Sequence, residues 1–225
     1  MNKRMSPSAL SDFVRCPRCF WLDRVKGIKK PRGIFPSLPG KMDELLKKRY
    51  DLYRGNDSLP PEMQGSFDGV LFKDQRKMDE WRDWRSGLVA NVDGIEVSGK
   101  LDDLLWDPKT NLVSVIDYKT KGDPPGEDYS TKYYQLQADC YDLMLSENGL
   151  LTSGKAYFVY YFPMKVKSAD KVLFNVKVQA ISTVPKNAAT VAKQAVTCLE
   201  GLMPLGLKTC ETCVYVNARV ANKKR

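Results

Sequence analysis

The sequence predicts an α/β sandwich built around a mixed β-sheet. Segments of helical periodicity stand at both ends and in the middle of the chain, and runs rich in β-branched and aromatic residues lie between them. The mostly apolar run 112–119 is typical of a central strand that is buried on both faces. That order of helices and strands fits helices packed against a sheet. A chain of 225 residues, 43% of them hydrophobic, is expected to form one domain with an ordinary core.

The first part of the chain is predicted to be mainly helical. Ser6 followed by Pro7 is a favourable helix start, because serine caps the helix and proline suits the first helical position. Residues 31–40 hold three prolines and two glycines and are expected to form a loop. The other elements expected here are a helix that restarts at Pro17, a helix at 42–54, a strand at 67–73 and a charged helix at 75–85.

The rest of the chain is predicted to contain most of the sheet. A β-hairpin is expected at 89–92 and 95–106, because Asp93-Gly94 between two strand-like runs is a strong turn signal. A loop at 121–130 follows the central strand. The remaining predicted elements are helices at 131–146 and 187–202 and strands at 155–162 and 172–181.

The composition favours a nucleic-acid partner and excludes some chemistry. A formal net charge of +9 suits a polyanion, with basic clusters at 24–32 and 47–49. No histidine occurs, so neither His-based acid–base catalysis nor His metal ligands are available. Neither an apolar signal segment nor a run of 18 apolar residues is present. We therefore expect a cytoplasmic protein without membrane contact, whose six cysteines are reduced or bind metal.

The most informative residues lie on two neighbouring strand-like segments. Gly99-x-x-Asp102 is followed by Asp117-x-Lys119, and residues i and i+2 of a strand project from the same face. Carboxylates that hold a divalent cation beside an ammonium are the groups that metal-dependent phosphodiester hydrolysis needs. The simpler interpretation is a salt bridge between Asp102 and Lys119. It is less attractive here, because buried charges are costly.

Three motifs in order, Gly99-x-x-Asp102, Asp117-x-Lys119 and Gln137-x-x-x-Tyr141, resemble the PD-(D/E)XK nuclease superfamily. Their order and spacing are most similar to the RecB-type branch, which includes the CRISPR-associated RecB-like exonucleases. The segment 8–22 is also similar to one that precedes the catalytic core in that branch. The resemblance implies a restriction-endonuclease-like sandwich. We expect one domain over 1–225, with the nuclease core at about 40–182 and the terminal segments 6–25 and 187–217 packed together.

The resemblance assigns roles to five residues. Asp102 and Asp117 are implied ligands of Mg²⁺ or Mn²⁺, and Lys119 is implied to stabilise charge on the phosphate or to orient water. Gln137 and Tyr141, four residues apart on one helical face, are implied to face the site.

Two further metal ligands are expected. The carbonyl of Tyr118 is a candidate third oxygen. RecB-type nucleases usually place a histidine on the preceding helix, where this chain offers Asp43 and then Glu44. A carboxylate suits these hard cations, although an acidic residue in the first turn of a helix is also ordinary.

The cysteines form two pairs near opposite ends of the chain. Cys16-x-x-Cys19 and Cys210-x-x-Cys213 have the spacing of a four-thiolate site, which would hold either Zn²⁺ or a [4Fe–4S] cluster. Several RecB-type nucleases join one N-terminal cysteine to three C-terminal ones with an iron–sulfur cluster. The resemblance therefore slightly favours the cluster over zinc, although the parallel with this arrangement of two plus two is incomplete. Buried thiols without a metal are the alternative.

We expect a metal-dependent, exonuclease-like DNA nuclease that serves DNA repair, recombination or CRISPR-type DNA processing. Basic segments and aromatic residues such as Trp21 and Tyr133 would guide a single strand or an opened end. The alternative is a catalytically weak nucleic-acid-binding module on a nuclease fold, and a cysteine-clamped adaptor would leave the acid–lysine motifs unexplained. No Gly-x-x-x-x-Gly-Lys-Ser/Thr loop is present, so any unwinding of DNA is expected to come from another protein. A helicase or an integrase is the kind of protein partner that we expect.

Overall fold

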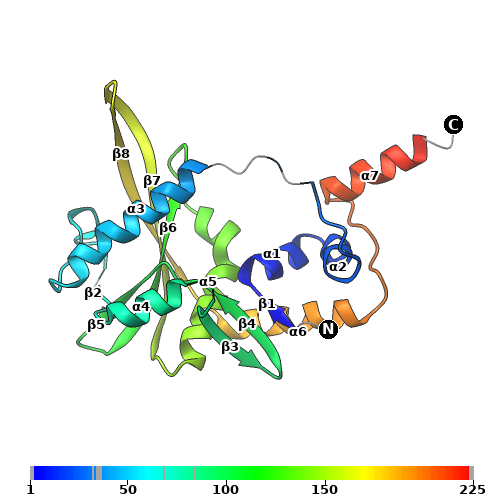
Figure 1. The fold of residues 1–225 in the computed structure, drawn as a ribbon, viewed down its shortest axis with the longest axis horizontal. Coiled ribbons are helices and arrows are strands. Elements are labelled where there is room, and N and C mark those ends of the chain that lie inside the picture. The colour runs from blue at the N-terminus through cyan, green and yellow to red at the C-terminus, as the bar shows by residue number, and fades with distance from the viewer. Residues whose placement is uncertain (1–2, 32, 34–36, 68, 84, 223–225) are drawn as a thin grey trace.

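A curled mixed sheet of five strands forms the centre of the computed structural model, which describes residues 3–31, 33, 37–67, 69–83 and 85–222 (Figure 1). The central strand pairs antiparallel with the strand before it and parallel with the strand after it. This confirms the predicted mixed α/β fold. In spatial order the strands are β2 (Val70–Leu71), β5 (Asp103–Asp107), β6 (Leu112–Thr120), β7 (Thr152–Ser168) and β8 (Lys171–Ser182).

A second sheet contains the predicted hairpin. It has the order β1 (Arg4–Met5), β4 (Ile95–Gly99) and β3 (Leu88–Val92), and Asp93 and Gly94 turn the chain with positive φ angles of 51° and 80°.

The prediction of one strand over 95–106 is wrong, because the chain leaves the small sheet after Gly99 and enters the large sheet at Asp103. Tertiary contacts cause the break. A Cβ atom on Gly99 would lie 3.2 Å from the ring of Tyr141, and the N–H of the buried Leu101 donates to the carbonyl of Trp81.

Helices cover both faces of the large sheet. The Ser6 hydroxyl accepts a hydrogen bond from the N–H of Ala9, so the predicted cap is present. The helix predicted at 42–54 begins earlier, at Ser37, since Pro39 falls in the first turn, where no N–H has a helical partner. The helices are α1 (Pro7–Arg15), α2 (Pro17–Lys26), α3 (Ser37–Arg54), the 3₁₀ turn η1 (Pro61–Met63), α4 (Gln75–Arg82), α5 (Tyr129–Glu147), α6 (Pro185–Glu200) and α7 (Glu211–Asn222).

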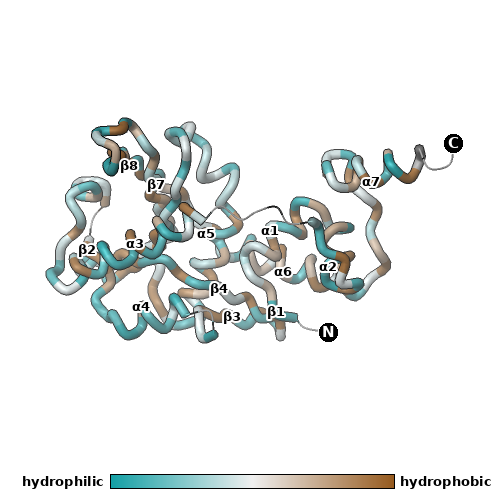
Figure 2. Tube along the Cα trace, turned by 45° about the horizontal axis from the view of Figure 1, so that its top comes forward, coloured by the Kyte–Doolittle hydropathy of each residue, from teal (hydrophilic) through white to brown (hydrophobic). Residues whose placement is uncertain are grey.

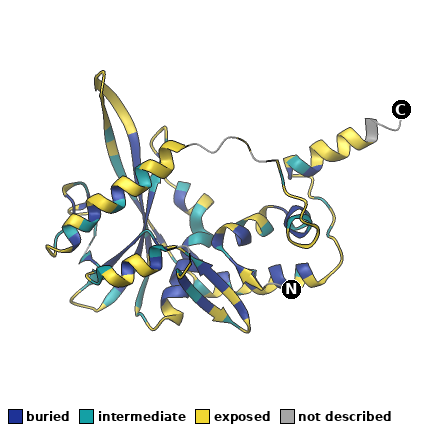
Figure 3. Cartoon of the chain, in the orientation of Figure 1, coloured by how far each residue is buried: buried dark blue, intermediate teal, exposed yellow. Residues whose placement is uncertain are grey.

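The core has two parts, one on each face of the large sheet. The strands that cross at the centre of this sheet are largely buried (Figure 3). On β6, Val113 and Val115 belong to the cluster that includes α5. Ile116 and Tyr118 belong to the cluster that includes α3. The side chains of β6 therefore alternate between the two helices, and this alternation fixes the face on which its charged residues lie.

The strands β7 and β8 are longer than predicted and continue past Phe162 as a projecting hairpin (Figure 1). We call residues 163–174 the arm. Apolar residues recur along it (Figure 2), and Met164 and Val166 are exposed. Lys165, Lys167 and Lys171 are exposed as well.

The terminal helices lie near one another. The indole N–H of Trp21 on α2 donates to the carbonyl of Gly201, just after α6, over a distance of 3.2 Å. The division into a core at about 40–182 and packed terminal segments stays a prediction. In the part of the chain that the structure describes, no helix has the length and apolarity needed to cross a membrane.

Candidate active site

Asp117 and Lys119 lie on the α5 face of the central strand. The Nζ atom of Lys119 is 2.5 Å from Oδ2 of Asp117, whose side chain is 2% exposed. Oδ1 of Asp117 accepts a hydrogen bond of 2.7 Å from Nε2 of Gln137 on α5. Between them, Tyr118 turns to the opposite face, where its ring contacts the tilted ring of Tyr50 on α3 with the ring centres 4.5 Å apart. The expected sharing of one face by the acid and the lysine is therefore present in the fold.

Gln137 and Tyr141 complete the α5 side of this site. Oε1 of Gln137 lies 3.4 Å from Nζ of Lys119, and its Nε2 is 3.1 Å from the Tyr141 hydroxyl. One amide thus contacts the acid, the lysine and the tyrosine. The Lys119 ammonium also lies 4.4 Å from the ring centre of Tyr134, a cation–π contact that the motifs did not indicate.

Asp102 joins the site from the turn between the two sheets. Its Oδ2 accepts a hydrogen bond of 3.1 Å from the backbone N–H of Tyr118, which places it beside β6. Its Oδ1 lies 2.7 Å from the ammonium of Lys47, and the same ammonium lies 2.8 Å from Oδ2 of Asp43. The predicted residues Asp43 and Asp102 are thus brought together, with Lys47 between them.

Burial shapes the charges of the site. Burial, with the nearby charge of Asp102 second, raises the pKa of Asp117 from 3.8 to about 7, although Lys119 opposes this. Burial would lower the pKa of Lys119, but the Asp117 carboxylate outweighs it, so the pKa is raised and the ammonium keeps its charge. Among the described residues, Oδ2 of Asp117 is the buried side-chain oxygen that receives no well-directed hydrogen bond. Its contact at 2.5 Å is with the Lys119 ammonium, so a metal ion bound here would share this oxygen with Lys119.

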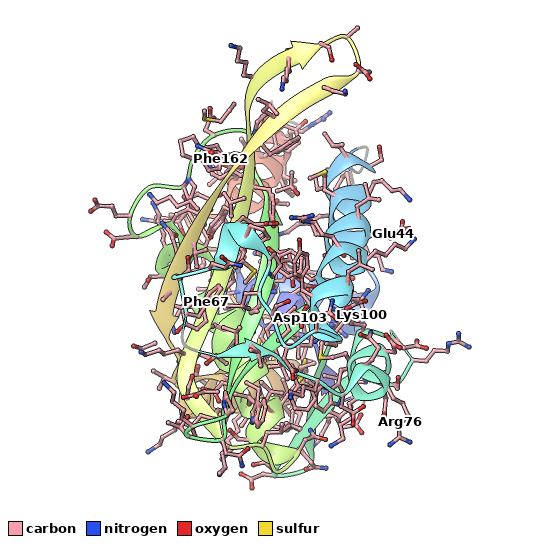
Figure 4. All side chains as sticks on the ribbon, turned by 90° about the vertical axis from the view of Figure 1, so that its left-hand side faces the viewer. Glu44, Phe67, Arg76, Lys100, Asp103 and Phe162 are labelled. Carbon is pink, nitrogen blue, oxygen red and sulfur yellow. The ribbon has the colours of Figure 1, made fainter. Side chains whose placement is uncertain are left out.

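Asp103, the first residue of β5, points to the face of the large sheet opposite the acid–lysine site. It lies between α3 and the sheet (Figure 4). It is fully buried and accepts two bonds of 2.8 Å from Arg54 and one from the Tyr118 hydroxyl. Arg82 reaches Asp103 at 3.1 Å and also donates to the backbone carbonyl of Asp102. This network holds the turn that presents Asp102, and sequence reasoning missed it because its members lie far apart in the chain.

A cleft of about 750 Å³ opens beside the acid–lysine site. Gln137 and Tyr141 form part of its wall, so it adjoins Asp117 and Lys119. Tyr133 also lines it and is 56% exposed. Basic residues contribute to the wall too, namely Arg4, Arg15 and Lys100.

Two groups that the sequence suggested for binding nucleic acid already have partners within the fold. Trp21 is buried against Gly201 instead of facing a strand. In the basic cluster 47–49, Lys48 pairs with Glu44 at 2.7 Å and Arg49 pairs with Glu62 at 2.9 Å. Glu44 lies on the outer side of α3 (Figure 4). Of the two acidic residues, Asp43 and Glu44, that the sequence offers as metal ligands on this helix, Asp43 is therefore the one that reaches the site.

The two cysteine pairs form a second site. Cys16 and Cys210 immediately precede α2 and α7, and Cys19 and Cys213 lie in the first turns of these helices. All four are buried, and their Sγ atoms lie within 4.8 Å of one another. Three of the separations are 3.7 Å: Cys16 to Cys213, Cys19 to Cys210, and Cys19 to Cys213. The N-termini of two helices favour thiolate ligands, and the cluster joins the two ends of the described chain.

Comparison with known proteins shows the family. The model of the PD-(D/E)XK nuclease superfamily matches residues 61–218, more than half of the chain, so the chain belongs to this superfamily. Membership indicates a nuclease, an enzyme that hydrolyses phosphodiester bonds and has nucleic acid as its substrate. The match includes Asp102, Asp117 and Lys119, whereas Asp43 and Cys16-x-x-Cys19 precede it.

Other comparisons add little. A search among curated proteins found no match. Among solved structures, the chain is similar to one described as "Crystal structure of SSO0001", with 15% identity over 88% of this chain and 77% of that chain. The TM-score of 0.43 is too low for this likeness to carry an argument.

Proposed function

We propose that this protein is a metal-dependent deoxyribonuclease of the RecB type, and that Asp102, Asp117 and Lys119 are its catalytic residues. The observation that carries the proposal is the contact of Gln137 with both Asp117 and Lys119. A buried acid and a half-buried lysine, fixed by one amide on the face that adjoins a basic cleft, are more than a surface salt bridge requires. The order of the motifs supports the RecB branch, and an exonuclease in DNA repair or CRISPR-type processing is the kind of enzyme this branch suggests.

The donor atoms of the site suit Mg²⁺ or Mn²⁺. Asp102 and Asp117 offer carboxylate oxygens, and the Tyr118 carbonyl and Asp43 are further oxygen donors, the ligands that these cations prefer. Oδ2 of Asp117, buried and without a well-directed hydrogen bond among the described residues, fits such a role. A divalent cation bound there would supply Lewis acidity at the attacked phosphate.

The chain's own residues then have distinct tasks. The Lys119 ammonium is placed to stabilise negative charge that develops on the phosphate. Gln137 holds Lys119 and Asp117 in fixed positions, and Tyr141 holds Gln137. The ring of Tyr134 supports the ammonium from one side without neutralising it.

The cleft supports a single strand or an opened end as the substrate. The exposed Tyr133 offers an aromatic face on which a base can stack, and stacking of this kind tolerates every base. Arg15 and Lys100 lie in the same cleft and suit the phosphates on either side. A helicase or an integrase stays the proposed class of protein partner, since opened ends must be supplied.

For the four cysteines, the separations favour one tetrahedral ion such as Zn²⁺. Four thiolates at about 2.3 Å from a central zinc lie about 3.8 Å apart. The three separations of 3.7 Å agree with that value. In a [4Fe–4S] cluster each thiolate binds a different iron atom, so the sulfurs lie farther apart. Elemental analysis of the anaerobically purified protein tests this, because zinc without iron supports the single ion, and iron with acid-labile sulfide contradicts it.

The nuclease proposal is tested by cleavage of end-labelled single-stranded and duplex DNA in Mn²⁺. The parent protein is compared with Lys119→Ala and with Lys121→Ala, a matched control two residues further on whose ammonium lies over the Tyr129 ring instead. We expect cleavage by the parent and by Lys121→Ala, and none by Lys119→Ala, with DNA binding retained in all three.

The product pattern then separates trimming from an end and internal cutting. If the parent binds DNA but cleaves neither form with any divalent cation, the protein is instead a nucleic-acid-binding module on a nuclease fold. Unchanged cleavage by Lys119→Ala would show that the acid–lysine motif is not the catalytic site.

A further inference from the structure

Lys47 stands between two of the proposed metal ligands. It follows Asp43 by one turn of α3, and its ammonium lies 2.8 Å from Asp43 Oδ2 and 2.7 Å from Asp102 Oδ1. The Lys47 side chain is 21% exposed, whereas that of the neighbouring Lys48 is 70% exposed. Both carboxylates therefore already contact a cation that belongs to the chain itself.

The Asp43–Lys47 pair leaves the net charge of the site unchanged. Asp102, Asp117 and Lys119 together carry one net negative charge when both acids are ionised, and the pair adds one charge of each sign. Without the charge of Lys47, three carboxylates would face one ammonium, and the site would carry two net negative charges. A divalent cation is attracted more strongly to the second arrangement, especially where burial weakens screening by water.

We propose that Lys47 is a resident counter-cation that competes with the divalent metal ion for Asp102 and thereby keeps the metal affinity of the site low. The inference rests on the proposed function, since it takes Asp102 as a metal ligand. A cation that binds Asp102 must displace the ammonium from Oδ1 or bind beside it, and repulsion between the two cations weakens binding in either case. Asp43 keeps Lys47 close, so the ammonium returns to Asp102 when the metal ion leaves.

A purely structural role for Lys47 predicts the opposite result. If the ammonium only held α3 against the turn that carries Asp102, its removal would loosen the ligands and weaken metal binding. Removal of a competitor strengthens metal binding. The sign of the change in affinity therefore decides between the two roles.

The test is Mn²⁺ binding to the full-length protein at pH 8 without nucleic acid, followed by the electron paramagnetic resonance signal of free Mn²⁺. Lys47→Gln removes the charge, and Lys47→Met repeats the test with a purely apolar side chain. Lys48→Gln is the matched control, because it removes a lysine one position away that pairs with Glu44 on the exposed side of the same helix. Asp117→Asn identifies the binding that belongs to the site.

We expect both Lys47 variants to bind Mn²⁺ at least about tenfold more tightly than the parent, because one full positive charge leaves the site. Lys48→Gln should match the parent, and Asp117→Asn should bind more weakly. Equal or weaker binding by both Lys47 variants, with unfolding midpoints like the parent's, would overturn the proposal. If the Lys47 variants bind Mn²⁺ more tightly but the parent cleaves no DNA, the result would contradict the proposed nuclease and leave the competition for Asp102 intact.

Discussion

Replacing Asp117 with asparagine is expected to stabilise the metal-free protein although it removes a proposed catalytic residue. Burial, followed by the charge of Asp102, raises the pKa of Asp117 from 3.8 to about 7. Each unit by which the pKa is raised corresponds to about 1.4 kcal/mol. Ionisation of Asp117 therefore lowers the free energy of unfolding by at most about 4 kcal/mol. Asparagine keeps an oxygen for the Gln137 amide but leaves Lys119 without its ionic partner. The raised pKa already includes the attraction between Asp117 and Lys119, so within this bound we expect a gain of about 1–3 kcal/mol in the free energy of unfolding above pH 7.

This gain should depend on pH in a defined direction. The pKa of Asp117 is higher in the folded state than in the unfolded state, so the folded protein binds the proton more tightly. The parent therefore loses stability through this group as the pH rises from about 4 to about 7, and Asp117→Asn does not. The difference between the two proteins should be small near pH 4 and largest above pH 7.

Urea unfolding at several pH values between 5 and 8 measures the difference. The protein is kept free of added divalent cations and chelators, so that any metal on the cysteines stays bound. Added Mn²⁺ should stabilise the parent and not the variant, because it binds only a folded site that retains its ligands. A variant that is less stable than the parent at pH 8, or a gain that does not change with pH, would refute the reasoning.

Three further changes test other parts of the structure. Arg54→Met leaves Asp103 fully buried without its two closest ionic bonds, so the free energy of unfolding should fall by about 3–5 kcal/mol in a chemical denaturation experiment, and a loss below about 1 kcal/mol would contradict the network. Cys213→Ser removes one of the four thiolates, so elemental analysis should show loss of the bound metal and thermal unfolding should begin at a lower temperature, whereas full metal content would rule out a four-thiolate site. Lys165→Gln combined with Lys171→Gln removes two exposed charges from the arm, so the slope of log Kd against log salt for duplex DNA should fall by about 2, and an unchanged slope would mean that the arm does not contact the phosphates.

The sequence was sufficient to predict the centre of the fold because its signals there are local. The apolar run at 112–119 predicted the buried strand β6, and the period of two placed Asp117 and Lys119 on one face. The spacing of the cysteines likewise indicated a shared site, and the four sulfurs are clustered.

The parts that sequence reasoning missed depend on contacts between distant segments. Alternation continues through residues 100–102, so only the packing of Gly99 and Leu101 shows where the strand ends. The spacing of Asp43 and Lys47 allows an ion pair on any helix, but nothing local indicates that the same ammonium meets Asp102. Trp21 was expected to guide a DNA strand, yet its contact with Gly201, 180 residues later, buries it.

The central claim is that this protein hydrolyses phosphodiester bonds at the acid–lysine site. Cleavage of a defined oligonucleotide in ¹⁸O-labelled water with Mn²⁺, followed by mass spectrometry of the products, tests it most directly. Hydrolysis predicts one ¹⁸O atom on each newly formed terminal phosphate, and no cleavage products from Asp102→Asn or Asp117→Asn. Products without ¹⁸O, or equal cleavage by the two variants, would contradict the assignment.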